Sequence, residues 1–128
     1  MTAKRSSRFR SATALTPMET FKHRVAHWSG RLRAQPRQIA VLRMTRKWAS
    51  CSTRGRVCFA RDLLDLPDRA QDYVIVHELL HLKHPNHGRV FRSLLSAYVP
   101  GWKNTNDRLR ATHRGLHSPS APETLDRY

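Results

Sequence analysis

Residues 72–82 read DYVIVHELLHL, and a further histidine, His87, follows five residues later. His77 and His81 stand four residues apart, which places both imidazoles on one face of a helix, one turn apart. Glu78 lies directly beside the first of them. Two imidazoles in this arrangement can bind one Zn²⁺, while the carboxylate handles the proton of a water that the ion activates. The stretch predicts zinc-assisted hydrolysis, with a peptide bond as the preferred substrate.

Two histidines downstream compete for the position of third metal ligand. His84 follows His81 by three residues, but three ligands along one straight helix spread over about 10 Å and converge poorly on a tetrahedral ion. His87 lies beyond Pro85 and Asn86, where the chain must turn, so we expect His87 to complete the site. Three protein ligands leave the fourth position for water, which is typical of catalytic rather than structural zinc. We expect one Zn²⁺ per chain.

The predicted chemistry assigns both proton transfers to Glu78. Its carboxylate accepts a proton from the zinc-activated water, the hydroxide attacks the scissile carbonyl, and Glu78 returns the proton to the leaving amine. Tyr98, His84 and Arg92 are candidates for stabilising the oxyanion by proximity in sequence only, and the choice among them stays open.

The residues around the motif indicate a buried helix. Residues 73–76 are apolar or aromatic and lead directly into the histidines. The alternative is an ordinary helix with surface histidines, but a buried helix does not carry Glu78 without a partner, because unpaired buried charge is costly. Asp68 followed by Gln71 predicts a capping box at the start of the helix, and Pro85 predicts its end near residue 83 or 84.

The rest of the chain divides into short elements. Apolar residues recur at spacings of three and four over residues 17–33, which predicts an amphipathic helix. The remaining expected elements are strands at 38–44, 47–51 and 56–60, a turn at 53–55, a helical turn at 61–66, and helices at 90–98 and 104–112, the last capped by Asn104. We therefore expect an α+β fold: an N-terminal helix, a small antiparallel three-stranded sheet, the motif helix and C-terminal helices.

The length of 128 residues predicts one folded domain. We expect it to span residues 17–112, between a disordered basic arm at 1–16 and a flexible tail at 113–128. No apolar run of 18 residues predicts a membrane span, and the basic N-terminus lacks the apolar core of a secretory signal. The expected compartment is the cytoplasm.

The two cysteines, Cys51 and Cys58, fall in adjacent predicted strands. Without an export signal we expect reduced thiols that serve as small apolar residues. Residues 48–52 have two interpretations that stay open. They form either an exposed edge strand that pairs with an extended peptide, or an internal strand with Trp48 in the core.

The net charge is +15, from 24 Lys and Arg against 9 Asp and Glu, and it is unevenly distributed. Residues 1–60 hold 14 of the basic residues and a single acid. This half is either a nucleic-acid footprint, because Lys and Arg displace counterions from phosphates, or a solvated Arg-rich surface. Both interpretations stay open.

Several stretches in combination resemble one family. They are WASCSTRG at 48–55, DYVIVHELLHL at 72–82, NHG at 86–88, Phe91, and YVPGW at 98–102. Over roughly residues 20–112 the chain resembles the YgjP-like metallopeptidase domain, which is related to the SprT-like and WLM zinc proteases within the zincins. Family members usually show Trp-Gly-Ser-Cys where this chain has Ala49, and they often carry more N-terminal sequence.

The resemblance implies a zincin-like minimal protease domain. It implies zinc ligation by His77, His81 and His87, catalysis by Glu78, and a peptide or protein substrate. The alternative is a basic nucleic-acid-associated protein, either a DNA-associated protease of the SprT-like kind or a binding module with structural zinc. The substitution Glu78→Gln separates a peptidase from a binding module. In a peptidase it abolishes peptide cleavage while the metal is retained, and in a binding module it has no effect.

Overall fold

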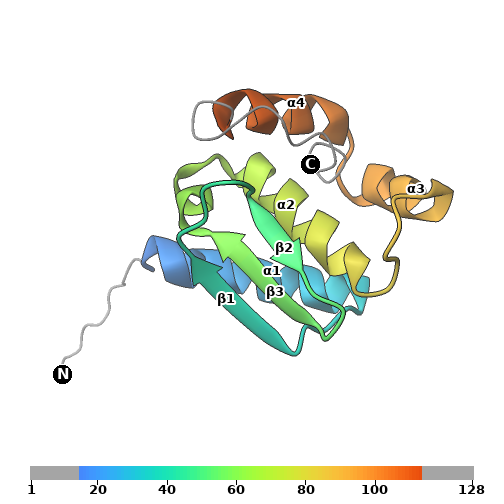
Figure 1. The fold of residues 1–128 in the computed structure, drawn as a ribbon, viewed down its shortest axis with the longest axis horizontal. Helices are drawn as coiled ribbons and strands as arrows, with labels where there is room; N and C mark the ends of the chain where they lie inside the picture. Colours follow the sequence, from blue (N-terminus) through green and yellow to red (C-terminus); the bar gives the residue numbers. More distant parts are fainter. Residues whose placement is uncertain (1–14, 114–128) are drawn as a thin grey trace, which may run out of the picture.

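The computed structural model describes residues 15–113, so most of the expected arm and tail, residues 1–14 and 114–128, lie outside the described part. The elements, in chain order, are α1 (Pro17–Leu32), β1 (Gln38–Leu42), β2 (Ala49–Cys51), β3 (Arg56–Ala60), the 3₁₀ helix η1 (Arg61–Asp65), α2 (Asp68–His81), α3 (Arg89–Tyr98) and α4 (Trp102–His113). The sheet packs against α1 and α2, which lie side by side, while α3 and α4 flank the other sides of α2 (Figure 1). The predicted α+β class is confirmed.

The sheet is mixed, and the prediction of an antiparallel sheet was wrong for one pair of strands. The strand order is β1-β3-β2, with β1 parallel to β3 and β2 antiparallel to β3. Residues 43–48 carry the chain across to the far edge, β2 runs back, and the turn then inserts β3 between the two earlier strands. Parallel partners need a crossover of about a dozen residues, and here residues 43–55, including β2, supply it.

The strand register separates the two cysteines. Ser50 lies opposite Cys58, and Cys51 lies opposite Val57. Because neighbouring side chains on a strand point to opposite faces, Cys51 and Cys58 lie on different faces of the sheet. Neither cysteine takes part in a disulfide.

The two interpretations of residues 48–52 each hold in part. β2 is an edge strand of the three-stranded sheet. Trp48, just before it, is nevertheless in the core with 3% of its surface exposed, and its indole Nε1 donates to the carbonyl of Leu109 at 3.3 Å. The residue before this edge strand is thus a core tryptophan, and its hydrogen bond connects the edge of the sheet to α4.

Helix α2 runs through the centre of the fold, and every residue from Tyr73 to Leu80 is buried. The predicted capping box at its start was wrong. Pro67 occupies the N-cap, the Gln71 amide donates to the carbonyls of the preceding segment, and the Asp68 carboxylate pairs with Arg24 on α1 at 3.0 Å. Asp68 therefore binds α1 and Gln71 binds the segment before α2, so neither side chain forms a local cap.

Two contacts fix α2 against α1. Asp72 accepts hydrogen bonds from the Arg24 guanidinium and from the Trp28 indole, each at 2.9 Å. At the other end of the fold, α4 begins at Trp102, two residues before the start that we predicted, so Asn104 lies inside the helix and does not cap it. No helix among residues 15–113 has the length and apolar character needed to cross a membrane.

Candidate metal centre

Helix α2 and the loop that follows it bring three imidazoles together. His77 and His81 lie one turn apart on α2, with ring centroids 4.8 Å apart. The loop reverses the chain and places His87 5.1 Å from the first ring and 4.6 Å from the second. One ring nitrogen from each histidine lies within 4.8 Å of the other two. The structure thus gathers the three residues that we predicted to be ligands.

The spacing of these nitrogens suits a single metal ion. His81 Nε2 and His87 Nε2 are 3.0 Å apart. Two nitrogens on a tetrahedral Zn²⁺, each bonded at about 2.0–2.1 Å, lie roughly 3.3 Å from each other. His77 is buried, with 1% exposed, whereas His81 and His87 are half-buried, so the centre opens toward solvent on their side.

Backbone and carboxylate partners orient two of the rings. Nδ1 of His81 lies 3.2 Å from the carbonyl oxygen of His84. A carbonyl only accepts, so Nδ1 carries the proton and Nε2 presents its lone pair. Nδ1 of His77 lies 3.2 Å from Oε2 of Glu78, which favours the same tautomer. A metal-binding histidine is typically oriented by such a bond from its second nitrogen, so the donor set fits a metal.

Glu78 is completely buried beside the first histidine. It follows His77 directly on α2, and the helix is enclosed on all sides at this point. The predicted general base is therefore adjacent to His77 and shielded from bulk solvent.

Phe91 on α3 packs against all three imidazoles and gives the metal centre an apolar side. Its ring centroid lies 5.2 Å from His77, 4.7 Å from His81 and 5.0 Å from His87, and only 2% of its surface is exposed. The sequence placed Phe91 on an amphipathic helix but gave no sign that this helix packs against the histidines. The contact depends on the chain reversal between α2 and α3.

Tyr73 supports His77 from the side of α4. The two rings are 5.8 Å apart, and the Tyr73 hydroxyl donates to Oδ1 of Asn106 at 3.2 Å, while Trp102 stacks on the tyrosine ring. Burial, together with the negative charges of Glu78 and Asp107, raises the pKa of Tyr73 far above its usual value. Tyr73 precedes His77 by four residues, a helical spacing from which its place on the same face could have been predicted.

The three candidates for stabilising the oxyanion have different positions. Arg92 contacts the loop that carries the third histidine, because its Nε donates to the carbonyl of His87 at 3.1 Å. His84 takes part through its backbone carbonyl, as described above. Tyr98 packs against Trp28 and Arg31 on α1, so the structure directs its ring away from the histidines.

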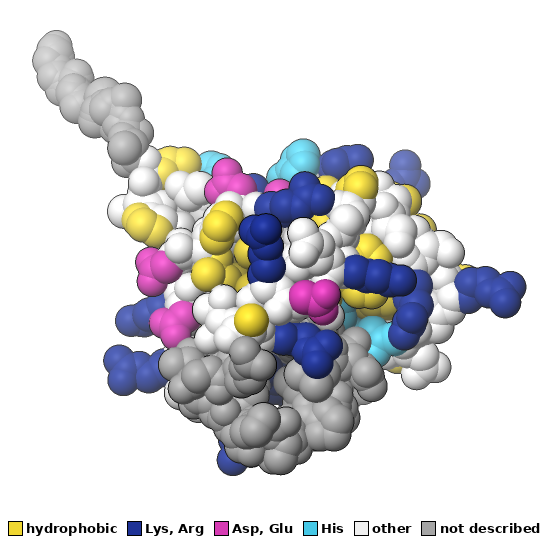
Figure 2. All heavy atoms as spheres, turned by 90° about the horizontal axis from the view of Figure 1, so that it is seen from above, with side chains coloured by type: hydrophobic (Ala, Val, Ile, Leu, Met, Phe, Trp, Pro, Cys, Tyr) yellow, Lys and Arg dark blue, Asp and Glu magenta, His cyan; other side chains and the backbone are white. Residues whose placement is uncertain are grey.

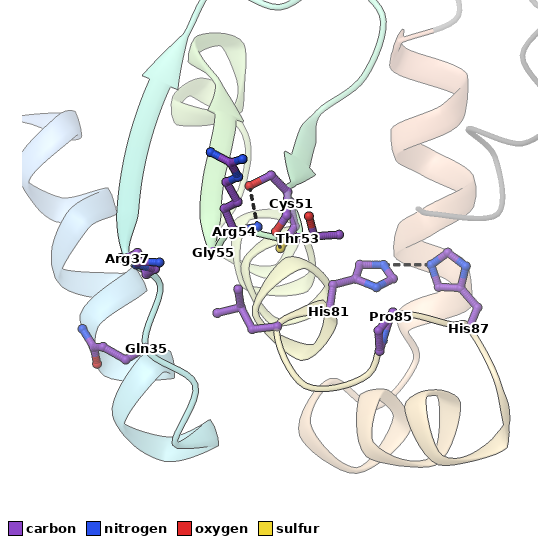
Figure 3. A pocket seen from close by; sticks show the side chains of 11 residues that line it. Gln35, Arg37, Cys51, Thr53, Arg54, Gly55, His81, Pro85 and His87 are labelled. Atoms are coloured by element: carbon purple, nitrogen blue, oxygen red, sulfur yellow. Dashed lines mark hydrogen bonds between the residues drawn. The ribbon is translucent and has the colours of Figure 1, made fainter.

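A cleft of about 540 Å³ opens beside the two half-buried histidines. Its walls are the end of α2 and the following loop, the β2–β3 turn at residues 51–55, and the segment before β1 that holds Gln35 and Arg37 (Figure 3). The cleft lies directly beside the metal centre.

On one face of the molecule, the basic side chains of the described residues are dispersed. Figure 2 shows Lys and Arg side chains spread over one face, next to a few Asp and Glu side chains, without a continuous basic stripe. A nucleic-acid footprint is expected to gather its positive charge on one face or helix. The face in Figure 2 shows no such concentration among the described residues, and both interpretations of the basic half stay predictions.

The chain was compared with protein families, curated proteins and solved structures. The family model described as YgjP-like, metallopeptidase domain, matches residues 2–112. No curated protein matched. The fold is similar to the crystal structure of the metallopeptidase zymogen abylysin of Pyrococcus abyssi, with a TM-score of 0.64, 22% identity, and coverage of 72% of this chain and 93% of that one.

A second similar structure is the metallopeptidase zymogen jannalysin of Methanocaldococcus jannaschii. It has a TM-score of 0.60 and 26% identity, with 72% of this chain and 91% of that chain covered. Both structures share the α+β fold described above. Because the family model spans most of the sequence, this chain belongs to the YgjP-like metallopeptidase domain family and is a metal-dependent peptide hydrolase.

Proposed function

We propose that His77, His81 and His87 hold one Zn²⁺ and that Glu78 is the general base and acid of peptide hydrolysis. One observation carries this proposal: the three imidazoles each offer a nitrogen within 4.8 Å of the others, next to a buried carboxylate. His77 and His81 come from α2, where their helical spacing puts them on one face, and His87 comes from the loop beyond it.

The donor set favours zinc in a catalytic role. Imidazole ligands also suit iron, copper and nickel, but three nitrogens arranged for a tetrahedron with one position left over are typical of catalytic zinc. When bound, zinc supplies Lewis-acid polarisation of the scissile carbonyl and makes a water acidic near neutral pH.

The side chains of the protein perform the remaining steps. Glu78 accepts the proton of the attacking water and later delivers it to the leaving amine, and its burial keeps that proton from bulk solvent between the two transfers. The bonds to the His84 carbonyl and to Glu78 fix the tautomer and the orientation of two imidazoles. The substrate lies in the cleft beside His81 and His87.

Metal analysis combined with a cleavage assay tests the proposal. The wild type should contain one zinc per chain and cleave a casein or peptide-library substrate. His87→Ala should lose most of the metal, while Glu78→Gln should keep the metal and lose cleavage.

His84→Ala is the matched control, because the backbone carbonyl that orients His81 remains after this substitution. It should keep the metal. Full zinc content in His87→Ala, or undiminished cleavage by Glu78→Gln, would overturn the proposed roles.

A further inference from the structure

The cleft that opens beside the histidines ends at two arginines. Figure 3 shows His81 and His87 on one side, Arg37 on the opposite side, and the β2–β3 turn with Arg54 between them. Among the described residues that line the cleft, none is acidic. The space next to the metal centre is therefore positively charged at its far end.

Arg37 packs directly against the β2–β3 turn. Its backbone N–H donates to the carbonyl of Gly55 at 2.8 Å. Gly55 has a φ of +88°, and a Cβ on this residue would lie only 3.0 Å from Cγ of Arg37. The stem of Arg37 thus lies directly over a residue that has no side chain, and the absence of a Cβ lets the arginine approach the turn.

Arg54 projects from a turn that Ser52 holds in shape. The Ser52 hydroxyl accepts from the backbone N–H groups of Arg54 at 3.3 Å and Arg56 at 3.2 Å. The Ser52 carbonyl also accepts from the N–H of Gly55 at 3.1 Å. These bonds span residues 52–56, so Arg54 starts from a defined backbone next to Arg37.

Neither guanidinium is neutralised within the described part of the chain. The Arg–carboxylate ion pairs among residues 15–113 are those of Arg24 with Asp68 and Asp72, on the far side of α2. A guanidinium binds a carboxylate through a planar pair of N–H groups, which makes an arginine pair a natural carboxylate site. The net charge of +15 would further raise the rate of encounter with acidic peptides.

We propose that Arg37 and Arg54 bind a carboxylate of the substrate while the scissile bond lies at the histidines, so that this peptidase prefers acidic segments. The carboxylate is either an Asp or Glu side chain or the free C-terminus of the peptide. The inference rests on the proposed function, because it requires the scissile bond to lie beside His81 and His87.

Synthetic peptides of about ten residues test the preference, since this length in extended form is enough to cross the site. A neutral scaffold is compared with versions in which Asp or Lys occupies each position in turn, and each version is made with a free and with an amidated C-terminus. Binding is measured by fluorescence anisotropy on the zinc-loaded Glu78→Gln protein, and cleavage by mass spectrometry on the wild type.

We expect one or two positions at which Asp raises kcat/KM and affinity over the neutral scaffold by roughly two- to thirtyfold, the range for two exposed charge pairs. A gain that follows the Asp position identifies a side-chain carboxylate, whereas a gain that vanishes on amidation identifies the terminal one. Equal values for the Asp, neutral and Lys peptides would overturn the inference.

Arginine variants connect the preference to the cleft. Arg37→Gln/Arg54→Gln should reduce the Asp-to-neutral ratio to about one, and Arg37→Glu/Arg54→Glu should favour Lys at the same positions. Arg43→Gln/Arg46→Gln removes the same charge from the exposed connection between β1 and β2 and should keep the wild-type ratio. Zinc content, measured for each variant, checks that the fold is intact.

Two outcomes would count against the inference in different ways. An Asp preference that survives in the Arg37→Glu/Arg54→Glu protein places the site elsewhere. An oligonucleotide that displaces the Asp peptide only when both arginines are present assigns them to phosphate instead. Failure of the proposed function is separate: the Glu78→Gln protein would then still cleave, while the Asp preference in binding could be intact.

Discussion

The metal centre draws its ligands from two very different regions. Helix α2 is buried on all sides from Tyr73 to Leu80, which encloses His77, while His81 at its end is half-buried and is oriented by the carbonyl of His84. The loop at residues 82–88 is largely exposed, and His87 depends on a few contacts with Phe91 and Arg92. The helix thus provides a rigid half of the site, and the loop provides a half that single substitutions can loosen.

The largest effect is expected on the rigid side, from Glu78→Gln. The substitution keeps the size of the side chain and removes its capacity to accept a proton, so kcat/KM should fall by about 10²- to 10⁴-fold. Zinc content should remain near one per chain, which atomic emission spectrometry measures. Loss of zinc together with activity would mean that Glu78 acts mainly by orienting His77.

Phe91 joins the two halves, and its removal should be the most damaging change to stability. Phe91→Ala leaves a cavity under all three imidazoles and should lower the free energy of unfolding by about 3–5 kcal/mol. Urea titration followed by circular dichroism gives this value. The neighbouring Val90→Ala is the control, because Val90 is 58% exposed, and a similar loss there would contradict the role of Phe91.

The loop half of the site alone is tested by Arg92→Gln, which removes the bond from Nε to the carbonyl of His87. This bond holds the backbone of His87 and contributes about 0.5–1.5 kcal/mol, so the zinc affinity should fall by roughly two- to tenfold while the fold persists. Competition with a chelating dye measures it. Arg89→Gln, at an exposed position at the start of α3, should leave the affinity unchanged.

Tyr73→Phe probes the rigid half with the smallest change. The lost hydroxyl leaves Asn106 without this donor and should cost about 1 kcal/mol near neutral pH. The fold raises the pKa of Tyr73 above about 10, which is its value in the unfolded chain. The neutral hydroxyl therefore stabilises the fold fully below about pH 10, and this contribution is lost as the pH rises further.

Unfolding measured from pH 8 to 12 tests the sign of this effect. The wild type should lose stability on the alkaline side more steeply than Tyr73→Phe does. Tyr98→Phe, whose ring packs on α1, is the control and should follow the wild type. Parallel curves for wild type and Tyr73→Phe would contradict the assignment.

The same contrast explains what could be predicted from the sequence. The spacing of His77 and His81 is a property of any helix, and it placed two of the three imidazoles correctly. His87 was favoured because Pro85 forces a turn, which the structure shows. Helices α1 and α3 matched their apolar periodicity, and β3 matched its predicted bounds.

Most of the wrong predictions concern partners outside the element itself, whereas the start of α4 at Trp102, two residues before Asn104, is a local error. The parallel pairing of β1 with β3 depends on where the chain crosses the sheet, and no local pattern specifies that crossing. Asp68 and Gln71 have the spacing of a capping box, but Arg24 and the carbonyls before the helix bind them instead. The roles of Phe91 and Arg92, and the cleft with its arginine pair, likewise arise only when separate segments meet.

A crystal structure of the zinc-loaded protein, with anomalous scattering recorded at the zinc edge, tests the central claim most directly. The account predicts one peak per chain, bonded to a nitrogen of His77, His81 and His87 at about 2.0–2.1 Å, with the carboxylate of Glu78 facing the remaining position. A peak held without His87, or one closed by a fourth protein ligand, would contradict it.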